Sequence, residues 1–136
     1  MSIKAEDIEK AINLVSGLYK FEPDGLFEQA VLALTPEAIL IYNDNAPDLV
    51  DGADWTYQVK VRLPLTSIEL VTNEVIKSKR KIKQITNRLT INSKNEEKKV
   101  YQFYYDNTNN KLASNFISGL KHHKVKTKVA ETTLTY

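Results

Sequence analysis

The spacing of apolar residues differs between the beginning of the chain and the rest, and it predicts a helix followed by strands. Apolar residues first recur three or four positions apart, as one stripe of an α-helix does, at Ile8, Ile12, Val15 and Tyr19. Acidic residues in the early turns favour the helix dipole. We therefore predict a helix over roughly residues 4–18, ended by Gly17 and the Pro23-Asp24-Gly25 turn.

Beyond residue 26 the pattern is typical of strands. The runs 27–34 and 38–42 flank Thr35-Pro36-Glu37, and they predict a hairpin because Pro36 would break a continuous helix. Later segments alternate apolar and polar residues, most clearly where Tyr57, Val59, Val61 and Leu63 share one face. Further strands are predicted over 57–63, 67–76, 88–92 and 100–105, with Tyr101, Phe103 and Tyr105 on one face and Tyr104 on the other.

A second helix is predicted near the end of the chain. Asn107 or Thr108 can cap it, and its apolar face consists of Leu112, Ala113, Phe116, Ile117 and Leu120. Residues 123–136 are interpreted as a basic C-terminal tail, in which residues 132–136 form either a late strand or a loose end.

These elements predict a mainly β (α+β) fold in one domain, 1–136. Short connections between successive strands favour antiparallel pairing. We expect a partly closed antiparallel barrel of about six or seven strands with a C-terminal capping helix and an extra N-terminal helix. Residues 1–22 would form the N-terminal helix and linker, 24–122 the core and 123–136 the tail.

Two stretches within this predicted core resemble bacterial PH-like and GRAM-like domains. In residues 30–42 a strand ends in a threonine-containing turn and the next strand ends in an aromatic residue. Residues 61–71 are similar to the family's apolar-Pro-Leu-Ser/Thr-x-Ile-x-x-Val stretch, and residues 100–120 stand in the place of its closing strand and helix.

The resemblance covers roughly residues 26–121 and implies a strongly bent, barrel-like sandwich capped by a helix. It implies binding rather than catalysis, as an analogy of fold. The chain departs from the family in its predicted N-terminal helix. Glu37-Ala38 also replaces the family's usual basic residue in the hairpin turn, so no ligand contact is carried over from that turn.

Composition narrows the class of protein. With 136 residues, 42% hydrophobic and 26% charged, the chain has enough apolar material for one core. It contains no cysteine, which excludes disulfides, zinc–thiolate sites, iron–sulfur clusters and a cysteine nucleophile. The N-terminal residues lack the apolar stretch of a signal peptide, and no apolar run is long enough to span a membrane. We therefore expect a cytoplasmic protein without a transmembrane segment.

Charge is distributed unevenly around a net charge of +2. Residues 1–56 carry a net charge of −8 and residues 57–136 one of +10. The densest basic run supplies the candidate anion-binding residues Lys77, Lys79, Arg80, Lys81 and Lys83. Such a run can attract anionic lipid or nucleic acid. It can equally be a solvated edge that prevents sheet-to-sheet aggregation.

No catalytic, cofactor or metal site is predicted. The four glycines are scattered, whereas a phosphate-cradling loop needs them clustered. The two histidines, His122 and His123, are neighbours. Neighbouring side chains on a helix point about 100° apart and rarely chelate one metal, so we interpret the pair as a surface feature.

We therefore expect a non-enzymatic interaction module that binds a protein or peptide, or associates with itself. The alternative is binding of anionic lipid or nucleic acid through residues 77–83. A third hypothesis, an enzyme with an unrecognised site, would require a polar pocket with clustered titratable groups.

Overall fold

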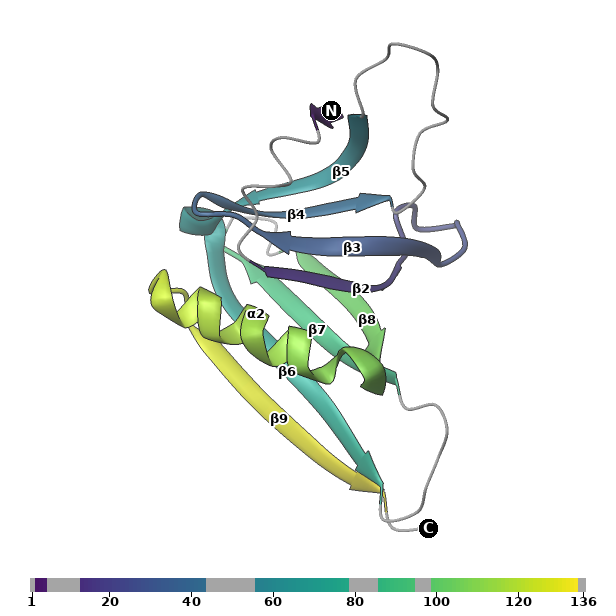
Figure 1. The fold of residues 1–136 in the computed structure, drawn as a ribbon, viewed down its shortest axis with the longest axis vertical. Coiled ribbons are helices and arrows are strands. Elements are labelled where there is room, and N and C mark those ends of the chain that lie inside the picture. Colours follow the sequence, from purple (N-terminus) through teal and green to yellow (C-terminus); the bar gives the residue numbers. More distant parts are fainter. Residues whose placement is uncertain (1, 5–12, 44–55, 79–85, 95–98, 135–136) are drawn as a thin grey trace.

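The computed structural model describes residues 2–4, 13–43, 56–78, 86–94 and 99–134. Within them, nine strands and one α-helix form the domain (Figure 1). The strands are β1 Ser2–Lys4, β2 Asn13–Tyr19, β3 Glu28–Leu34, β4 Ala38–Asn43, β5 Thr56–Pro64, β6 Ile68–Ser78, β7 Thr86–Ser93, β8 Val100–Asp106 and β9 Thr127–Leu134. The helix α2 spans Asn110–His122, and two 3-10 turns span Leu65–Ser67 and Asn107–Asn109.

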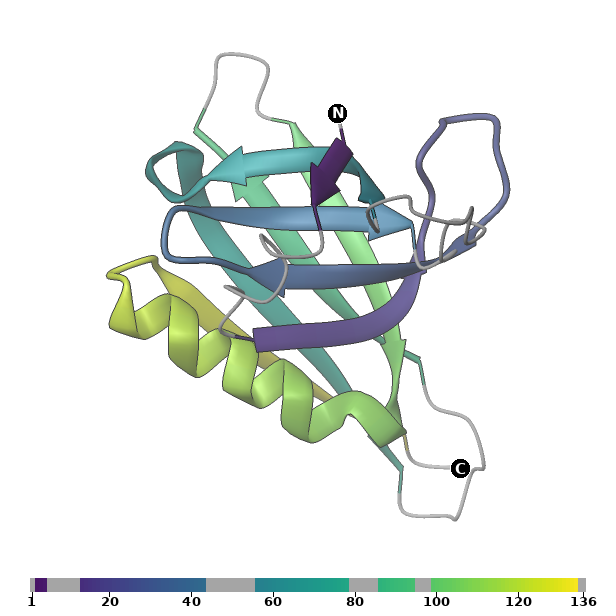
Figure 2. The ribbon, with the colours of Figure 1, turned by 45° about the horizontal axis from the view of Figure 1, so that its top comes forward.

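The strands form one sheet in the order β1-β5-β4-β3-β2-β8-β7-β6-β9. β2 and β8 share a single residue pair, Leu18 with Tyr104, and there the sheet divides into two half-sheets that cross at an angle (Figure 2). The sheet is not closed, since β1 and β9 lie at opposite ends of the order. The predicted mainly β fold with a C-terminal helix is confirmed, although the described residues form nine strands instead of six or seven.

The core lies between α2 and the inner faces of the two half-sheets. Val15, Leu32, Leu89 and Phe103 are fully buried there, and burying such a side chain stabilises the fold by about 1.5–3 kcal/mol. The helix contributes the predicted apolar face, except that Leu112 remains 44% exposed. The buried helix residues are Ala113, Phe116, Ile117 and Leu120.

Both faces of the β3–β4 hairpin are buried. A second cluster lies on the side of the hairpin facing away from the main core and consists of Val31, Ala33, Ala38, Leu40 and Tyr42. Burial on both faces explains why these strands are almost continuously apolar instead of alternating.

The predicted hairpin turn is confirmed in detail. Thr35 Oγ1 donates a hydrogen bond to the Ala38 carbonyl oxygen at 2.9 Å and accepts one from the Ala38 N–H at 3.0 Å. The Thr35 N–H also donates to the Ala38 carbonyl oxygen at 2.9 Å. This threonine side chain therefore supplies the polar contacts that hold the turn together.

The helix predicted over residues 4–18 is wrong wherever the structure describes it, because Lys4 ends β1 and residues 13–18 belong to β2; residues 5–12 lie outside the described residues. Val15 and Tyr19 are four residues apart, a spacing that fits both a helical stripe and one face of a strand. Seven residue pairs with β3 hold the segment as a strand. Such long-range pairing outweighs a weak helix preference.

The C-terminal segment differs from the predicted basic tail, since residues 127–134 form β9. The late strand that was one alternative for residues 132–136 is present over residues 132–134. β9 pairs in parallel with β6, from Val71 with Thr127 to Ser78 with Leu134. Parallel pairing requires a long crossover, which α2 provides here by bringing the chain back along the sheet (Figure 1).

Candidate interaction surfaces

Gly17 allows the two half-sheets to meet. A β-carbon at Gly17 would lie 2.0 Å from the Tyr104 carbonyl oxygen and 2.7 Å from Phe103 Cε1. No other residue type fits this close backbone approach. The junction between β2 and β8 therefore depends on a glycine, which the sequence pattern alone presents as a helix end.

Exposed apolar side chains gather beside this junction. Leu18 is 43% exposed and Phe27 is 52% exposed. The Phe27 ring packs edge-on against Tyr104, with ring centroids 5.4 Å apart and an interplanar angle of 87°. We name Leu18, Phe27 and Tyr104 the junction surface. Exposed apolar side chains that gather around aromatic rings in this way are typical of protein-binding patches.

A groove of about 400 Å³ adjoins the junction surface. Its lining includes Ser16, Gln29 and Asp106 together with Leu18 and Tyr104. Hydrogen bonds from the Thr108 and Asn109 side chains hold the pKa of Asp106 below its usual value. The groove therefore combines apolar walls with one carboxylate that is ionised at neutral pH.

Strand edges border the same groove. Residues 13–17 of β2 pair with β3 on one side, while on the other side β2 pairs with β8 only at Leu18. In the part of the chain that the structure describes, no second strand occupies the remaining edge of β2. The helix α2 packs against β2 at Asn13, so the stretch of β2 that borders the groove is Ser16 and Gly17. Such an edge can accept an added strand through backbone hydrogen bonds.

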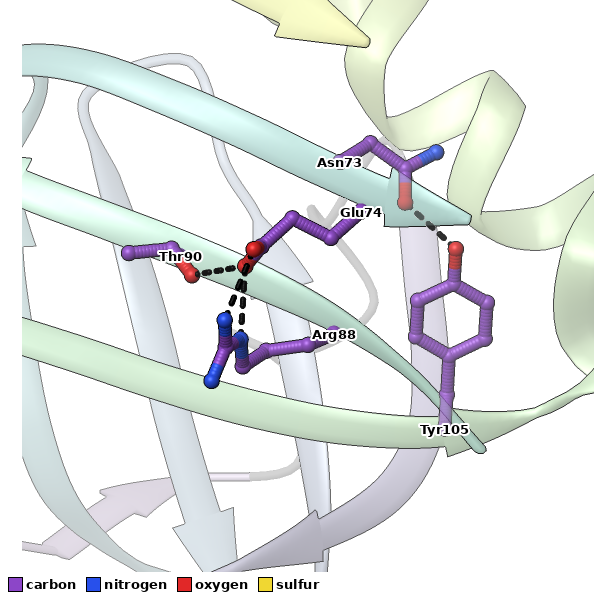
Figure 3. A network of polar contacts seen from close by, with 5 residues as sticks. All are labelled: Asn73, Glu74, Arg88, Thr90 and Tyr105. Carbon is purple, nitrogen blue, oxygen red and sulfur yellow. Dashed lines mark hydrogen bonds and ion pairs between the residues drawn. The ribbon is translucent and has the colours of Figure 1, made fainter. Parts of the chain in front are cut away.

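The outer face of the C-terminal half-sheet carries a charged network (Figure 3). Arg88 Nε and Nη2 donate to the two oxygens of Glu74 at 2.6 and 2.7 Å, and Thr90 Oγ1 donates to the same carboxylate at 2.8 Å. The hydrogen bond from Arg88 is the main cause that lowers the pKa of Glu74. Both charges are satisfied internally, so this network stabilises the β6–β7 pair.

The inner face of the same half-sheet holds a second polar group. Tyr105 Oη donates a hydrogen bond to Asn73 Oδ1, and the two side chains point toward α2 (Figure 3). Nearby, Asn87 Oδ1 accepts from the Ile76 N–H at 2.7 Å, while Asn87 Nδ2 donates to Asn110 Oδ1 at 2.9 Å. These contacts tie the beginning of α2 to the sheet.

Of the five candidate anion-binding residues of the basic run 77–83, the structure describes only Lys77. Lys77 Nζ lies 3.1 Å from Glu131 Oε1 of β9, at the rim of a groove of about 380 Å³ between α2 and the β6–β9 pair. The other candidate anion-binding residues, Lys79, Arg80, Lys81 and Lys83, lie outside the described residues. The described part of the run thus forms an intramolecular ion pair.

The histidine pair lies at the end of α2, and its two members differ in environment. His122 is exposed, whereas His123 is partly buried, and their rings meet edge-on with centroids 5.6 Å apart. Among the described residues, no three side chains of the types His, Cys, Asp and Glu gather as a metal site would require. No described helix has both the length and the apolar character needed to cross a membrane.

Of the junction surface, the sequence predicts only the direction of Tyr104. The predicted outward direction of Tyr104 is confirmed by its position in β8, between the buried residues Phe103 and Tyr105. The helical interpretation of residues 4–18 gives no indication that Leu18 lies beside Tyr104. Apolar and polar residues also alternate over residues 13–19 in a way that would place Leu14 and Leu18 on the outer face of a strand. This alternation is the signal that could have indicated the surface.

The chain is similar to a known protein in its fold. No family model and no curated protein matches the sequence. The structure is similar to "The hSac2 domain from human phosphoinositide phosphatase Sac2", with a TM-score of 0.53 and 12% sequence identity. The match covers 93% of this chain and 79% of that chain.

Proposed function

We propose that this chain is a non-catalytic interaction domain that binds an extended segment of a protein partner at the junction surface. The observation that carries this proposal is the exposure of Leu18 and Phe27 beside the groove where β2 and β8 separate. An exposed apolar patch gains free energy when a partner covers it.

The groove defines the chemistry of the segment. The short stretch of β2 at Ser16 and Gly17 that borders the groove suits an extended backbone, which would add to the sheet there. The junction surface favours an apolar side chain, and the Asp106 carboxylate favours a nearby lysine or arginine. The expected ligand is therefore an extended peptide with one apolar anchor and one basic residue.

A binding role also agrees with the arrangement of ionisable groups. The groove contains a single carboxylate among its described residues, and Thr108 and Asn109 both donate hydrogen bonds to it. General acid–base catalysis usually employs at least two positioned groups with complementary roles.

The PH-like assignment is part of the proposal, as is a cytoplasmic location. The threonine-held β3–β4 turn, the break at Pro64 between β5 and β6, and the β8–α2 closure occur where the family resemblance implies them. The structural neighbour belongs to a phosphoinositide phosphatase. The TM-score supports a shared fold, and the low identity leaves the ligand of this chain to be argued from its own side chains.

The alternative, binding of anionic lipid or nucleic acid through residues 77–83, gains no support from Lys77, because its ammonium group forms an ion pair with Glu131. The junction surface is therefore the site to test first.

The test is selection of random peptides displayed on phage against the immobilised protein, followed by titration of the enriched peptides by fluorescence anisotropy. We expect enriched sequences to share an apolar residue and a lysine or arginine. Leu18→Glu should abolish their binding, and Asp106→Asn should weaken it.

Leu112→Glu is the matched control, since Leu112 on α2 is 44% exposed and Leu18 is 43% exposed. Circular dichroism would verify that each variant folds. Peptides that bind the wild type and Leu18→Glu equally would contradict the proposal. Light scattering on the same variants tests for self-association. If the wild type is a dimer that Leu18→Glu abolishes and Leu112→Glu retains, the junction surface binds a second copy of this chain.

A further inference from the structure

A second hollow lies far from the junction surface. It has a volume of about 500 Å³ and forms where the start of β6, the end of β7 and the turn between α2 and β9 meet. This volume falls in the range of small-molecule sites. Thr86 of the junction groove and Lys94 of this hollow stand at opposite ends of β7, about 26 Å apart along the strand.

The hollow is strongly basic. Three lysines and one histidine line it, against a single carboxylate from Glu69. The basic residues are Lys94, His123, Lys124 and Lys126. The ion pairs among the described residues, Lys77 with Glu131 and Arg88 with Glu74, involve none of them. The positive charge of the three lysines is thus available to a ligand.

His123 supplies an independent observation. Its Nε2 atom is buried and has no hydrogen-bond partner among the described residues. A buried polar nitrogen left without a partner destabilises a fold. His123 lines the hollow, so a rotation of its ring toward the hollow would let an anion oxygen there accept a hydrogen bond from Nε2–H.

The helix dipole does not account for this cluster. Lysines and histidines near a helix C-terminus are favoured by the dipole, which explains Lys121 and His122. Lys94 follows β7, and Lys126 precedes β9, so these two lysines come from outside the helix. Lys126 lies in the same short turn as His123, whereas the approach of Lys94 to this turn requires the tertiary structure.

The end of α2 does not oppose an anion either. The Gly119 and Leu120 carbonyl oxygens accept hydrogen bonds from the His123 N–H, and Leu120 also accepts one from the Val125 N–H at 3.0 Å. The Lys124 N–H donates to the Lys121 carbonyl oxygen at 3.0 Å. These bonds satisfy three of the last four carbonyl groups of the helix, which leaves fewer free acceptors to repel a negative ligand.

Backbone contacts also fix the positions from which the lysine side chains extend. The Lys94 N–H donates to the Ser67 carbonyl oxygen at 2.7 Å, and the Lys126 carbonyl oxygen accepts from the Val71 N–H at 3.0 Å. Lys124 has a left-handed backbone conformation with φ 62°. Anchored backbones reduce the entropy lost when the side chains close on a ligand.

From these observations we infer that the hollow binds a phosphate group carried by a small ligand or a lipid headgroup. A phosphate offers several acceptor oxygens and up to two negative charges, which several ammonium groups and one imidazole N–H can share. The hollow involves neither the junction surface nor residues 77–83.

Titration of the intact protein with pyrophosphate, followed by two-dimensional amide NMR and calorimetry, tests this inference. We expect saturable shifts concentrated at Lys94 and at residues 123–126. His123→Ala and Lys124→Gly should each weaken binding roughly tenfold, the size expected for one lost charge-assisted hydrogen bond. Glycine keeps the left-handed backbone at position 124, so this variant removes the charge alone.

His122→Ala and Lys121→Gln are the matched controls, since both residues lie at the same end of α2 and neither lines the hollow. Shifts spread over many lysines, or equal binding by His123→Ala and His122→Ala, would overturn the inference. Absence of saturable binding of both pyrophosphate and phosphatidic acid vesicles would overturn it as well.

Vesicles distinguish the two sources of phosphate. The site would be assigned to a lipid headgroup if the protein binds phosphatidic acid vesicles, if His123→Ala reduces this binding, and if pyrophosphate does not inhibit it. Saturable binding of pyrophosphate with no vesicle binding would assign it to a soluble ligand. Equal binding to phosphatidic acid and phosphatidylserine vesicles, unchanged by His123→Ala, would indicate diffuse surface attraction and contradict the inference.

Discussion

Gly17 of β2 lies directly against the main chain of Tyr104, so that a β-carbon on Gly17 would fall 2.0 Å from the Tyr104 carbonyl oxygen. This approach joins the two half-sheets at the Leu18–Tyr104 pair. It also determines where the sheet opens into the groove of the proposed peptide site.

Gly17→Ala is expected to destabilise the protein. The added methyl group meets backbone, which cannot rotate away, so β2 and β8 must separate. Overpacking of this kind costs about 1–3 kcal/mol, measurable by equilibrium urea unfolding. Ser16→Ala, an exposed neighbour on the opposite face of β2, should change stability by less than about 0.5 kcal/mol. Equal stability of Gly17→Ala and wild type would refute the required close approach.

Tyr105→Phe is expected to destabilise the fold by about 1–3 kcal/mol, because it leaves the buried Asn73 Oδ1 without its donor. Unfolding free energies of Tyr105→Phe, Asn73→Ala and the double variant would give the coupling between the two residues. A coupling energy near zero would show that the hydrogen bond contributes nothing to stability.

The same tyrosine predicts a dependence on alkaline pH. Burial raises the pKa of Tyr105 to about 12 from the usual 10.0, against a lowering effect of the hydrogen bond to Asn73. Its contribution to stability is therefore fully present below about pH 10 and is lost as the pH rises from there to about 12. Urea unfolding at about pH 9 and about pH 11 should show a smaller decrease for Tyr105→Phe than for wild type. An identical decrease in both proteins would contradict this assignment.

Glu74→Gln tests the outer network. The pair is partly exposed, with side chains 34–38% accessible, so we expect a loss of about 0.5–1 kcal/mol at neutral pH. Since Arg88 lowers the pKa of Glu74, this stability is present above the usual pKa of 4.5 and is lost as the pH falls through the lower folded value. The free energy of unfolding of Glu74→Gln should consequently be lower than that of wild type at neutral pH and should decrease less as the pH is lowered.

Lys124 occupies a left-handed backbone conformation. A β-branched residue there is strained, so Lys124→Val should destabilise the protein by about 1–2 kcal/mol. Lys124→Gly should be at least as stable as wild type, because glycine adopts this conformation without steric cost. Thermal unfolding of both variants would check this, and equal loss in the two would mean that the lysine side chain, and not its backbone, matters for folding.

Local chemistry was enough to predict several parts of the fold. Thr35 and Pro36 indicated the hairpin, and the alternation of Phe103, Tyr104 and Tyr105 indicated which side chains are buried. The apolar face of the closing helix was also predicted, apart from Leu112. In each case the determining interactions lie within a few residues, so the pattern itself carries the information.

The candidate sites depended on contacts that no local pattern contains. His122 and His123 look alike in sequence, yet only His123 reaches the hollow, because Val125 and Lys126 bond back to α2 and β6. Likewise, Leu18 and Phe27 become neighbours of Tyr104 only after β2 and β8 meet.

By itself, the sequence determined a mainly β domain without cysteine chemistry, with a β3–β4 hairpin and a C-terminal helix, because turn residues and periodicity act over short distances. The tertiary structure decided that residues 13–19 form a strand, that residues 127–134 pair in parallel with β6, and that Lys94 meets the basic turn 123–126. Each of these outcomes rests on pairing between segments distant along the chain, whose free energy exceeds the local preference of either segment.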